Sequence, residues 1–145
     1  MPAPYFLRLT FGIDLHRRPF VGLTHIKVGI ANPARPGRAI ELTFLVDSGA
    51  IYSVIPAAVL RKLGVKAHSK RTFILADGTE ITRKIGDVLF RLNGRMGAAP
   101  VIFGEKEDST LLGSVSLEAL GMALDPIKRE LRPLPMVLAQ NALPQ

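Results

Sequence analysis

The stretch that decides the fold is Phe44-Leu45-Val46-Asp47-Ser48-Gly49-Ala50. Three apolar residues suited to a buried strand are followed at once by an acid, a hydroxyl and a glycine. At average residue frequencies, such a run arises by chance in about one chain in a hundred of this length. A plain strand-ending turn has the same pattern, because Asp47 can accept the backbone N–H two residues on and Gly49 is conformationally permissive. The stretch alone leaves both interpretations open.

Three further motifs follow it in order. The segment from Pro56 to Leu63 combines good helix formers with one apolar stripe, and Gly64 closes it. Next comes Leu75-Ala76-Asp77-Gly78-Thr79, which contains the Asp-Gly dipeptide of a hairpin turn. Leu111-Leu112-Gly113 then leads into a short helical segment. This order of motifs favours a specialised loop at Asp47 over an ordinary turn.

Over about residues 22 to 134 the chain resembles the retropepsin-like aspartic proteases, most closely their small bacterial and archaeal single-domain members. The resemblance implies a mainly β fold, a closed β-barrel with a flap hairpin and one or two short helices. The sequence departs from the family pattern at Ser48, where Thr is usual, and in a flap with fewer glycines than retroviral members have. The Ser keeps the hydroxyl and loses only a methyl group.

The same resemblance implies roles for the motif residues. The implied catalytic residues are Asp47, Ser48 and Gly49. Contacts with substrate are implied for Ala50, Ala76, Asp77, Gly78 and Thr79. Structural support of the loop is implied for Leu112 and Gly113, where a strand passes too close behind the loop to carry a side chain at the glycine. A hydroxyl at position 48 would reach across a two-fold axis to the loop of a partner chain.

The length of the chain bounds the mechanism. With 145 residues it fits one domain and is too short for two lobes that each supply an acid. We divide it into an N-terminal extension or interface strand (1–21), a protease-like domain (22–134) and a C-terminal tail (135–145). Because Asp-[Ser/Thr]-Gly occurs once, the second carboxylate of a pair that shares one proton has to come from a second chain. We therefore expect a homodimeric endopeptidase that hydrolyses peptide or protein substrates with water activated between two copies of Asp47.

Positive charge dominates the composition. Lys and Arg outnumber Asp and Glu by 19 to 12, a net charge of +7, and such a field favours acidic partners. A second hypothesis therefore stays open: a catalytically silent, basic, dimeric β-barrel that binds acidic protein or nucleic acid. We do not expect nucleic acid as the partner, because the chain has no Trp and no aromatic residues among its basic clusters. The intact Asp47, Ser48, Gly49 and Gly113 favour the enzyme.

The sequence lacks the residues that other classes of function require. Without cysteine there is neither a disulfide framework nor a thiolate metal site. His16, His25 and His68 are too irregularly spaced for a metal-binding helix. No run approaches the roughly 20 apolar residues of a membrane span, and the N-terminus lacks the basic-then-apolar order of a secretory signal. We expect no metal, no cofactor and no membrane, with a cytoplasmic location as the default.

Periodicity and turn residues predict the remaining elements. Strands are expected over residues 5–13, 22–30, 38–46, 71–75, 79–85, 87–92 and 98–103. The Asp77-Gly78 turn is expected to need positive φ at both residues. We predict a charged, exposed turn at 105–108 and a helix at 115–120 capped by Ser114. The apolar run at 136–139 follows two prolines, which favours an edge strand or an extended arm.

Overall fold

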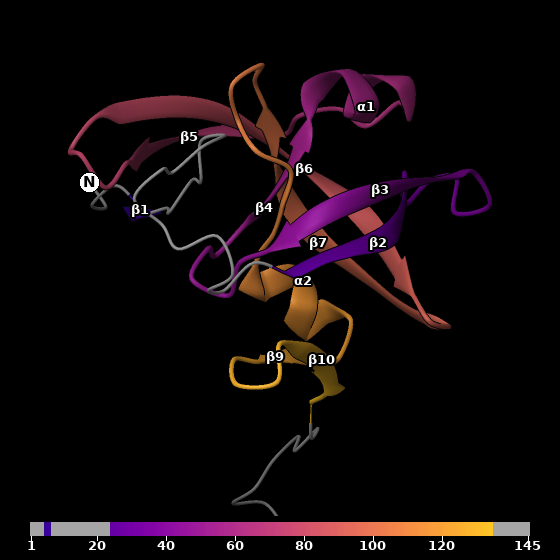
Figure 1. Cartoon of the computed structure of the whole chain (residues 1–145). Coiled ribbons are helices and arrows are strands. Elements are labelled where there is room, and N and C mark those ends of the chain that lie inside the picture. Colours follow the sequence, from indigo (N-terminus) through magenta and orange to yellow (C-terminus); the bar gives the residue numbers. More distant parts are fainter. Residues whose placement is uncertain (1–4, 7–23, 135–145) are drawn as a thin grey trace, which may run out of the picture.

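A computed structural model of the chain describes residues 5–6 and 24–134 (Figure 1). Its centre is the antiparallel pair of β2 (Thr24–Ala31) and β3 (Ala39–Val46), paired in register along their whole length. The loop between them contains Pro33 and Pro36, which have no N–H to give to a ladder, so pairing stops there. The prediction of two antiparallel strands that lead into Asp47 is confirmed.

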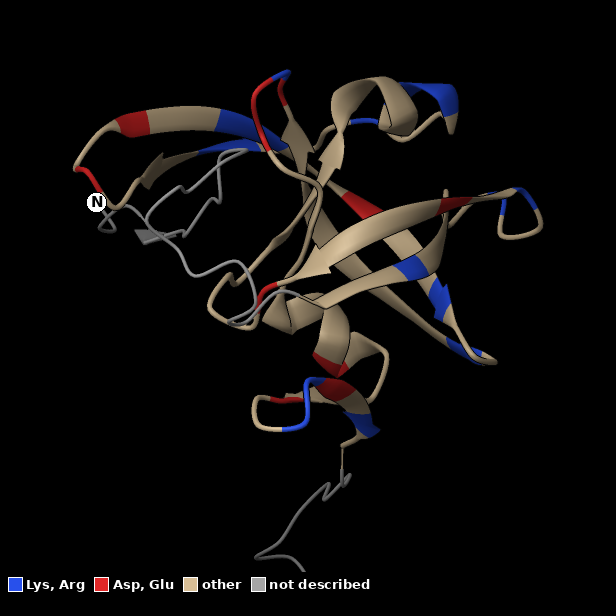
Figure 2. Cartoon of the chain, viewed as in Figure 1, with Lys and Arg blue, Asp and Glu red and all other residues tan. Residues whose placement is uncertain are grey.

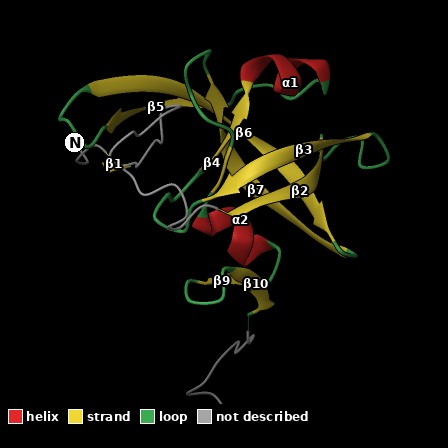
Figure 3. Cartoon of the chain, viewed as in Figure 1, coloured by secondary structure: helices red, strands yellow, loops and turns green. Residues whose placement is uncertain are grey.

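Six strands form a ring that is close to a barrel (Figure 3). Besides β2 and β3, its members are β4 (Ser53–Pro56), β6 (Glu80–Leu92), β7 (Arg95–Gly104) and β8 (Leu111–Leu112). The order is β6-β2-β3-β8-β4-β7, and pairing between β6 and β7 closes the ring. The sheet is mixed because β8 runs parallel to β3 and β4 runs parallel to β7. The predicted mainly β, barrel-like fold is confirmed.

Strand β6 runs unbroken for 13 residues, where the sequence predicts two strands, over 79–85 and 87–92. Its first part pairs with β5 (Ser69–Ile74) and its second part with β7. A Cβ at Gly86 would lie 2.8 Å from the ring of Phe103. The glycine therefore marks a close approach inside a continuous strand, and it does not break the chain.

The β6–β7 turn consists of Asn93 and Gly94, with φ of 49° and 79°. Both residues adopt positive φ, as a two-residue hairpin loop of this handedness requires. Strand β7 consequently begins directly after the turn, at Arg95, three residues earlier than the sequence predicts.

Two hydrophobic clusters fill the interior. The larger one joins strands of the ring to both helices, and its ring pair Phe44 and Phe90 lies with centroids 6.1 Å apart. Each fully buried aromatic or large aliphatic side chain of this kind contributes about 1.5–3 kcal/mol. The smaller cluster contains Ala50, Val54, Phe73, Leu75, Ile85, Ile102 and Leu111. It connects the segment after Asp47 with the two strands of the flap hairpin.

The two helices are short. Helix α1 (Ala57–Lys62) ends before Gly64, whose φ is 76°, in agreement with the predicted segment. Helix α2 (Ser114–Ala119) begins one residue earlier than predicted, and Gly113 is its N-cap without a side-chain cap. Capping by Ser114 is therefore wrong. The first N–H groups of the helix donate instead to carbonyls of the loop that follows Asp47.

Beyond α2, the chain forms a small hairpin of β9 (Met122–Asp125) and β10 (Glu130–Pro133) that the sequence does not predict. The Asp125 carboxylate accepts the backbone N–H groups of Ile127 and Lys128 in its turn. These two bonds, with the nearby Arg132, lower the pKa of Asp125 below its usual value.

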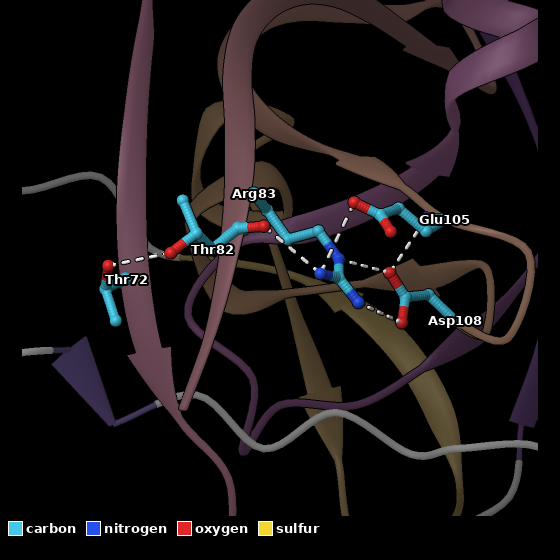
Figure 4. A network of polar contacts seen from close by, with 5 residues as sticks. All are labelled: Thr72, Thr82, Arg83, Glu105 and Asp108. Carbon is cyan, nitrogen blue, oxygen red and sulfur yellow. Dashed lines mark hydrogen bonds and ion pairs between the residues drawn. The ribbon is translucent and has the colours of Figure 1, made fainter. Parts of the chain in front are cut away.

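The turn between β7 and β8 differs from its prediction at one residue. Glu105, Lys106 and Glu107 are exposed as expected, but the side chain of Asp108 is fully buried. Its carboxylate accepts two hydrogen bonds from Arg83, at 2.7 and 3.1 Å, and one from the Glu105 backbone N–H at 2.8 Å (Figure 4). The bond to Asp108 raises the pKa of Arg83 above its usual range.

At the N-terminus, β1 (Tyr5–Phe6) pairs in parallel with β5, opposite Phe73 and Ile74. The rest of the strand predicted over 5–13, and the apolar run at 136–139, lie outside the described residues. The boundaries proposed at 21/22 and 134/135 stay predictions. Among the helices of the described residues, none is long and apolar enough to cross a membrane.

Candidate active site

Asp47 lies at the end of β3, in a loop whose backbone is fixed by hydrogen bonds. Its N–H donates to the carbonyl of Leu112 at 3.0 Å, and its own carbonyl accepts the N–H of Ala50 at 3.0 Å. Its carboxylate oxygen Oδ1 accepts the N–H of Gly49 at 2.9 Å. The turn geometry that the sequence allows at this point is therefore present. The bond to β8 adds what an ordinary turn lacks, a second segment that holds the acid from behind.

Gly113 provides the space for that second segment. Strand β8 runs parallel to β3, with Leu112 opposite Val46, and brings Gly113 against the chain that leaves the loop. A Cβ there would lie 2.8 Å from the carbonyl oxygen of Ile51 and from backbone atoms of Tyr52. No side chain fits at that distance. The contacts agree with the supporting role predicted for Gly113, and its φ of −94° shows that the requirement is steric.

A buried hydroxyl pair, which the sequence analysis missed, completes this support. Ser53 Oγ accepts the N–H of Gly113 at 2.9 Å and lies 2.5 Å from the hydroxyl of Ser116. Both serines are fully buried. The available signal was a lone hydroxyl at the start of the apolar run Ser53-Val54-Ile55, because a buried hydroxyl needs a partner.

The loop residues differ in how far they reach solvent. Ser48 and Gly49 are exposed and Asp47 is half-buried, whereas Ala50 is fully buried in the smaller core cluster. Ile51 is one of the few large apolar side chains that are exposed, at 38%. The acid, the hydroxyl and an apolar contact thus lie together at the surface. The role of Ala50 in substrate binding stays a prediction. Because its side chain is buried, Ala50 can affect substrate only through the shape of the loop.

The predicted flap is the hairpin of β5 and β6, which projects from the ring (Figure 1). Leu75 closes its tip: its carbonyl accepts the N–H of Gly78 at 2.9 Å, and its N–H donates to Thr79 at 2.8 Å. Only Gly78 has positive φ, at 86°, so the expectation of positive φ at both Asp77 and Gly78 is wrong. The loop has three residues, Ala76 included, and such loops place one glycine in the left-handed region.

Asp77 stabilises the tip through a hydrogen bond within the turn. Its Oδ1 accepts the N–H of Thr79 at 2.9 Å. This bond, with the Thr79 hydroxyl as a second donor, lowers the pKa of Asp77 below its usual value. Residues 76–79 are all exposed, which leaves them accessible to a ligand.

Tyr52 links the loop to the flap. Its hydroxyl accepts a short hydrogen bond from Arg71 on β5, whose guanidinium carbon lies 5.4 Å from the Tyr52 ring centroid. Phe73, also on β5, meets the same ring edge-on with centroids 6.3 Å apart. The sequence analysis missed this contact, since residues 52 and 71 share no local pattern. It couples the position of the flap strand to the segment that follows Asp47.

The ionisable residues of the described segments do not form a metal centre: no group of three or more His, Asp or Glu side chains is arranged to hold an ion there. The structure instead brings together the Asp47 loop, Gly113, and the β5 residues Arg71 and Phe73 that contact Tyr52.

A family model for aspartyl proteases matches residues 35–122. The chain belongs to the retropepsin-like aspartyl protease family. The matched span contains the Asp47 loop, the flap hairpin and Gly113, so the predicted resemblance is confirmed. No curated protein matches the chain.

Proposed function

We propose that this aspartyl protease family member is a homodimeric endopeptidase in which Asp47 of each chain acts on one shared water molecule. The observation that carries the proposal is the Asp47 loop, fixed from behind by Leu112 and Gly113 while Ser48 and Gly49 remain exposed. One such loop is half of a two-acid site. The exposed Ile51 beside it provides apolar surface that a second copy would bury.

In this mechanism the two carboxylates share one proton, because two like charges held close together do not both ionise. The ionised carboxylate takes a proton from the water as the water attacks the scissile carbonyl carbon. The protonated carboxyl group donates a hydrogen bond to the carbonyl oxygen, where negative charge develops. The C–N bond then breaks as the amine nitrogen receives a proton. No residue other than the two copies of Asp47 has to change its protonation state.

The flap supplies the binding half of the proposal. A peptide in extended form between the flap tip and the Asp47 loop would find main-chain donors and acceptors at residues 76–79. Closure of the hairpin would then exclude bulk water from the two acids. The contact between Tyr52 and Arg71 supports this coupling, because it ties the flap strand to the loop after Asp47.

A mixed peptide library tests the proposal. The wild-type protein should cleave it, and Asp47→Asn should reduce the rate by at least about 10²-fold, since general acid–base help is worth roughly that much. Asp87→Asn is the matched control: Asp87 is an exposed acid on β6, outside the loop, and its loss should leave the rate unchanged.

The competing hypothesis, a basic binding module without catalysis, gives the opposite result in the same assay. Neither the wild-type protein nor Asp47→Asn would cleave any peptide, and both would bind acidic polymers with equal affinity. Cleavage that survives Asp47→Asn in full would place the acid elsewhere and overturn the assignment of Asp47.

A further inference from the structure

A concave site lies apart from the Asp47 loop. It is a cavity of about 1210 Å³ between α1 and the segment after it, the first parts of β5 and β6, and the turn after β7. Within the described chain its lining includes neither the Asp47 loop nor the flap tip. It does include Lys70 and Lys84, which lie at the base of the flap hairpin. A ligand held there would contact the flap without touching the acid.

The charge of this cavity is unbalanced. Its exposed cations, which have no ion-pair partner among residues 5–6 and 24–134, are Arg61, Lys66, Lys70, Lys84 and Lys106. Figure 2 shows such residues on α1 and on the adjoining part of β5 and β6. Lys70 and Lys84 face each other directly in the β5–β6 ladder, an arrangement that is destabilising by itself. An anionic ligand would relieve that repulsion.

The two acids of the lining, Glu105 and Asp108, do not cancel this field, because the lining has six cations with Arg83 included, which leaves a net charge of +4. The guanidinium of Arg83 binds the buried Asp108 through two hydrogen bonds and lies 3.4 Å from Glu105 (Figure 4). In the same view the side chains of Thr72 and Thr82 bond to each other at 3.0 Å, away from this ion pair. Arg83 thus engages both acids, and the other five cations of the lining have no ion-pair partner among the described residues.

The lining and the size of the cavity indicate the class of ligand. Its apolar lining residues are Pro56, Ala57, Ala58, Val65, Ala67 and Phe103. The volume exceeds the roughly 300–1,000 Å³ that small-molecule pockets have, and a lining that combines apolar and basic residues fits a chain that alternates apolar and acidic groups. Phe103, the aromatic residue of the lining, is only 7% exposed. Without an open aromatic face for stacking, a nucleic-acid strand is the poorer fit.

We propose that this cavity binds an acidic peptide segment with interspersed apolar residues, and that it does so in protein substrates as a docking site remote from the bond that is cleaved. The role in substrates rests on the proposed function; the binding of an acidic peptide does not. Docking at Lys70 and Lys84 would hold the substrate chain next to the flap and raise its local concentration at the Asp47 loop.

Fluorescence anisotropy with the Asp47→Asn protein measures this binding without cleavage. The probe is a fluorescein-labelled decapeptide rich in Glu with two Leu, and its counterpart has Gln in place of every Glu. The acidic peptide should bind and the Gln peptide should not. Lys70→Glu/Lys84→Glu should weaken binding by roughly tenfold or more, because two attractive contacts become repulsive. The exchange retains one like-charge pair in the ladder, so the fold should tolerate it.

The control variant is Lys27→Glu/Arg38→Glu, which changes the net charge equally at exposed residues outside the cavity. Its affinity should stay within about twofold. Lys66→Glu/Lys106→Glu is a second cavity variant that leaves the ladder untouched, and it should weaken binding as well. If the control and cavity variants lost affinity equally, the overall charge alone would account for binding, and the proposal would be overturned. Tighter binding of a ten-nucleotide oligo(dT) would overturn it in favour of nucleic acid.

Cleavage kinetics separate the two proposals. For a substrate that carries the acidic segment, the cavity variants should raise KM and leave kcat unchanged, whereas a substrate without the segment should show no difference. An inactive wild-type protein that still binds the acidic peptide through Lys70 and Lys84 would refute the endopeptidase and keep the docking site. An active protein whose cavity variants bind and cleave like wild type would refute the docking site alone.

Discussion

Gly113 lies in the segment that supports the Asp47 loop. The carbonyl of its neighbour Leu112 accepts the Asp47 N–H, and the N–H of Gly113 donates to the buried hydroxyl of Ser53. The next residue, Ser114, donates to the Ala50 carbonyl at 2.8 Å. Three consecutive residues thus bond to the segment 47–53, and the missing side chain at Gly113 is what lets them approach.

Gly113→Ala should displace the loop. Its Cβ would lie 2.8 Å from backbone atoms that cannot rotate away, so we expect a loss of about 1–3 kcal/mol in the free energy of unfolding. Activity should fall by about 10²-fold, because a shift of an ångström at the reacting groups has that effect. Thermal unfolding measures the loss of stability, and peptide cleavage measures the loss of activity.

Gly37→Ala is the matched control. Gly37 lies in the β2–β3 loop with no atom within 4 Å of the position of its Cβ, so the same substitution should change neither stability nor rate. If Gly113→Ala matched this control in both measurements, the steric argument for Gly113 would be wrong.

In the proposed function, the flap hairpin is the element that would govern access to the site. Gly78 provides the positive φ that its three-residue loop needs, and Asp77 bonds across the loop to Thr79. The base of the hairpin is packed into the smaller core cluster through Phe73 and Ile85. A rigid base and an exposed tip allow changes at the tip to alter binding without unfolding the barrel.

Gly78→Val should impair substrate binding while the core stays folded. A β-branched residue at a φ of 86° is strained, by about 1–2 kcal/mol, although no neighbouring atom obstructs the side chain. We expect a roughly tenfold lower kcat/KM, with a Tm lower by several degrees and a core that stays folded. Gly37→Val, outside the flap, is the control for both measurements. An unchanged cleavage rate in a folded Gly78→Val protein would make the hairpin an ordinary surface turn.

Acid should loosen the same tip. The pKa of Asp77 is lowered below its ordinary value of 3.8, chiefly by the hydrogen bond from the Thr79 N–H. A depressed carboxyl pKa means that the stabilising bond is present above that ordinary value and is lost as the pH falls through the lowered one. The Thr79 amide should therefore shift, and exchange faster, in an NMR titration below about pH 4. In Asp77→Asn this acid step should be missing; its persistence there would assign the titration to another group.

At the scale of the whole molecule, one chain supplies one acid. The Asp-Ser-Gly loop occurs once in 145 residues, and the described surface beside it carries the exposed Ile51. A dimer with closed two-fold symmetry would place two copies of the same loop against each other, each with its Ser48 hydroxyl toward the partner. Dimerisation follows from the proposed mechanism and is open to direct test.

A heterodimer of one wild-type chain and one Asp47→Asn chain should cleave peptides about 10²–10⁴-fold more slowly than the wild-type dimer, because a single carboxylate cannot divide the acid and base roles. Orthogonal tags allow its purification, and sedimentation velocity confirms that it is intact. Half of the wild-type rate would mean that each chain contains a complete site. A protein that stays monomeric with a transition-state mimic bound would exclude the shared-water mechanism altogether.

The sequence by itself determined the features that rest on short-range patterns. Alternating apolar residues and the loop with two prolines produced β2 and β3, and the Asp47 turn follows from three adjacent residues. Gly64 and Gly121 end the two helices as their positive φ requires. The order of these motifs was enough to identify the family, because each motif consists of residues adjacent in the sequence.

Only the tertiary structure decided the features made by residues far apart in the sequence. Ser53 pairs with Ser116 and Arg83 with Asp108 across separate strands, so a buried carboxylate appears where the sequence shows an exposed turn. Likewise, the carbonyls of the Asp47 loop replace the predicted Ser114 cap. The basic cavity contains cations from α1, the segment after it, β5, β6 and the β7–β8 turn. Burial and partner choice depend on long-range packing, which local propensity does not encode.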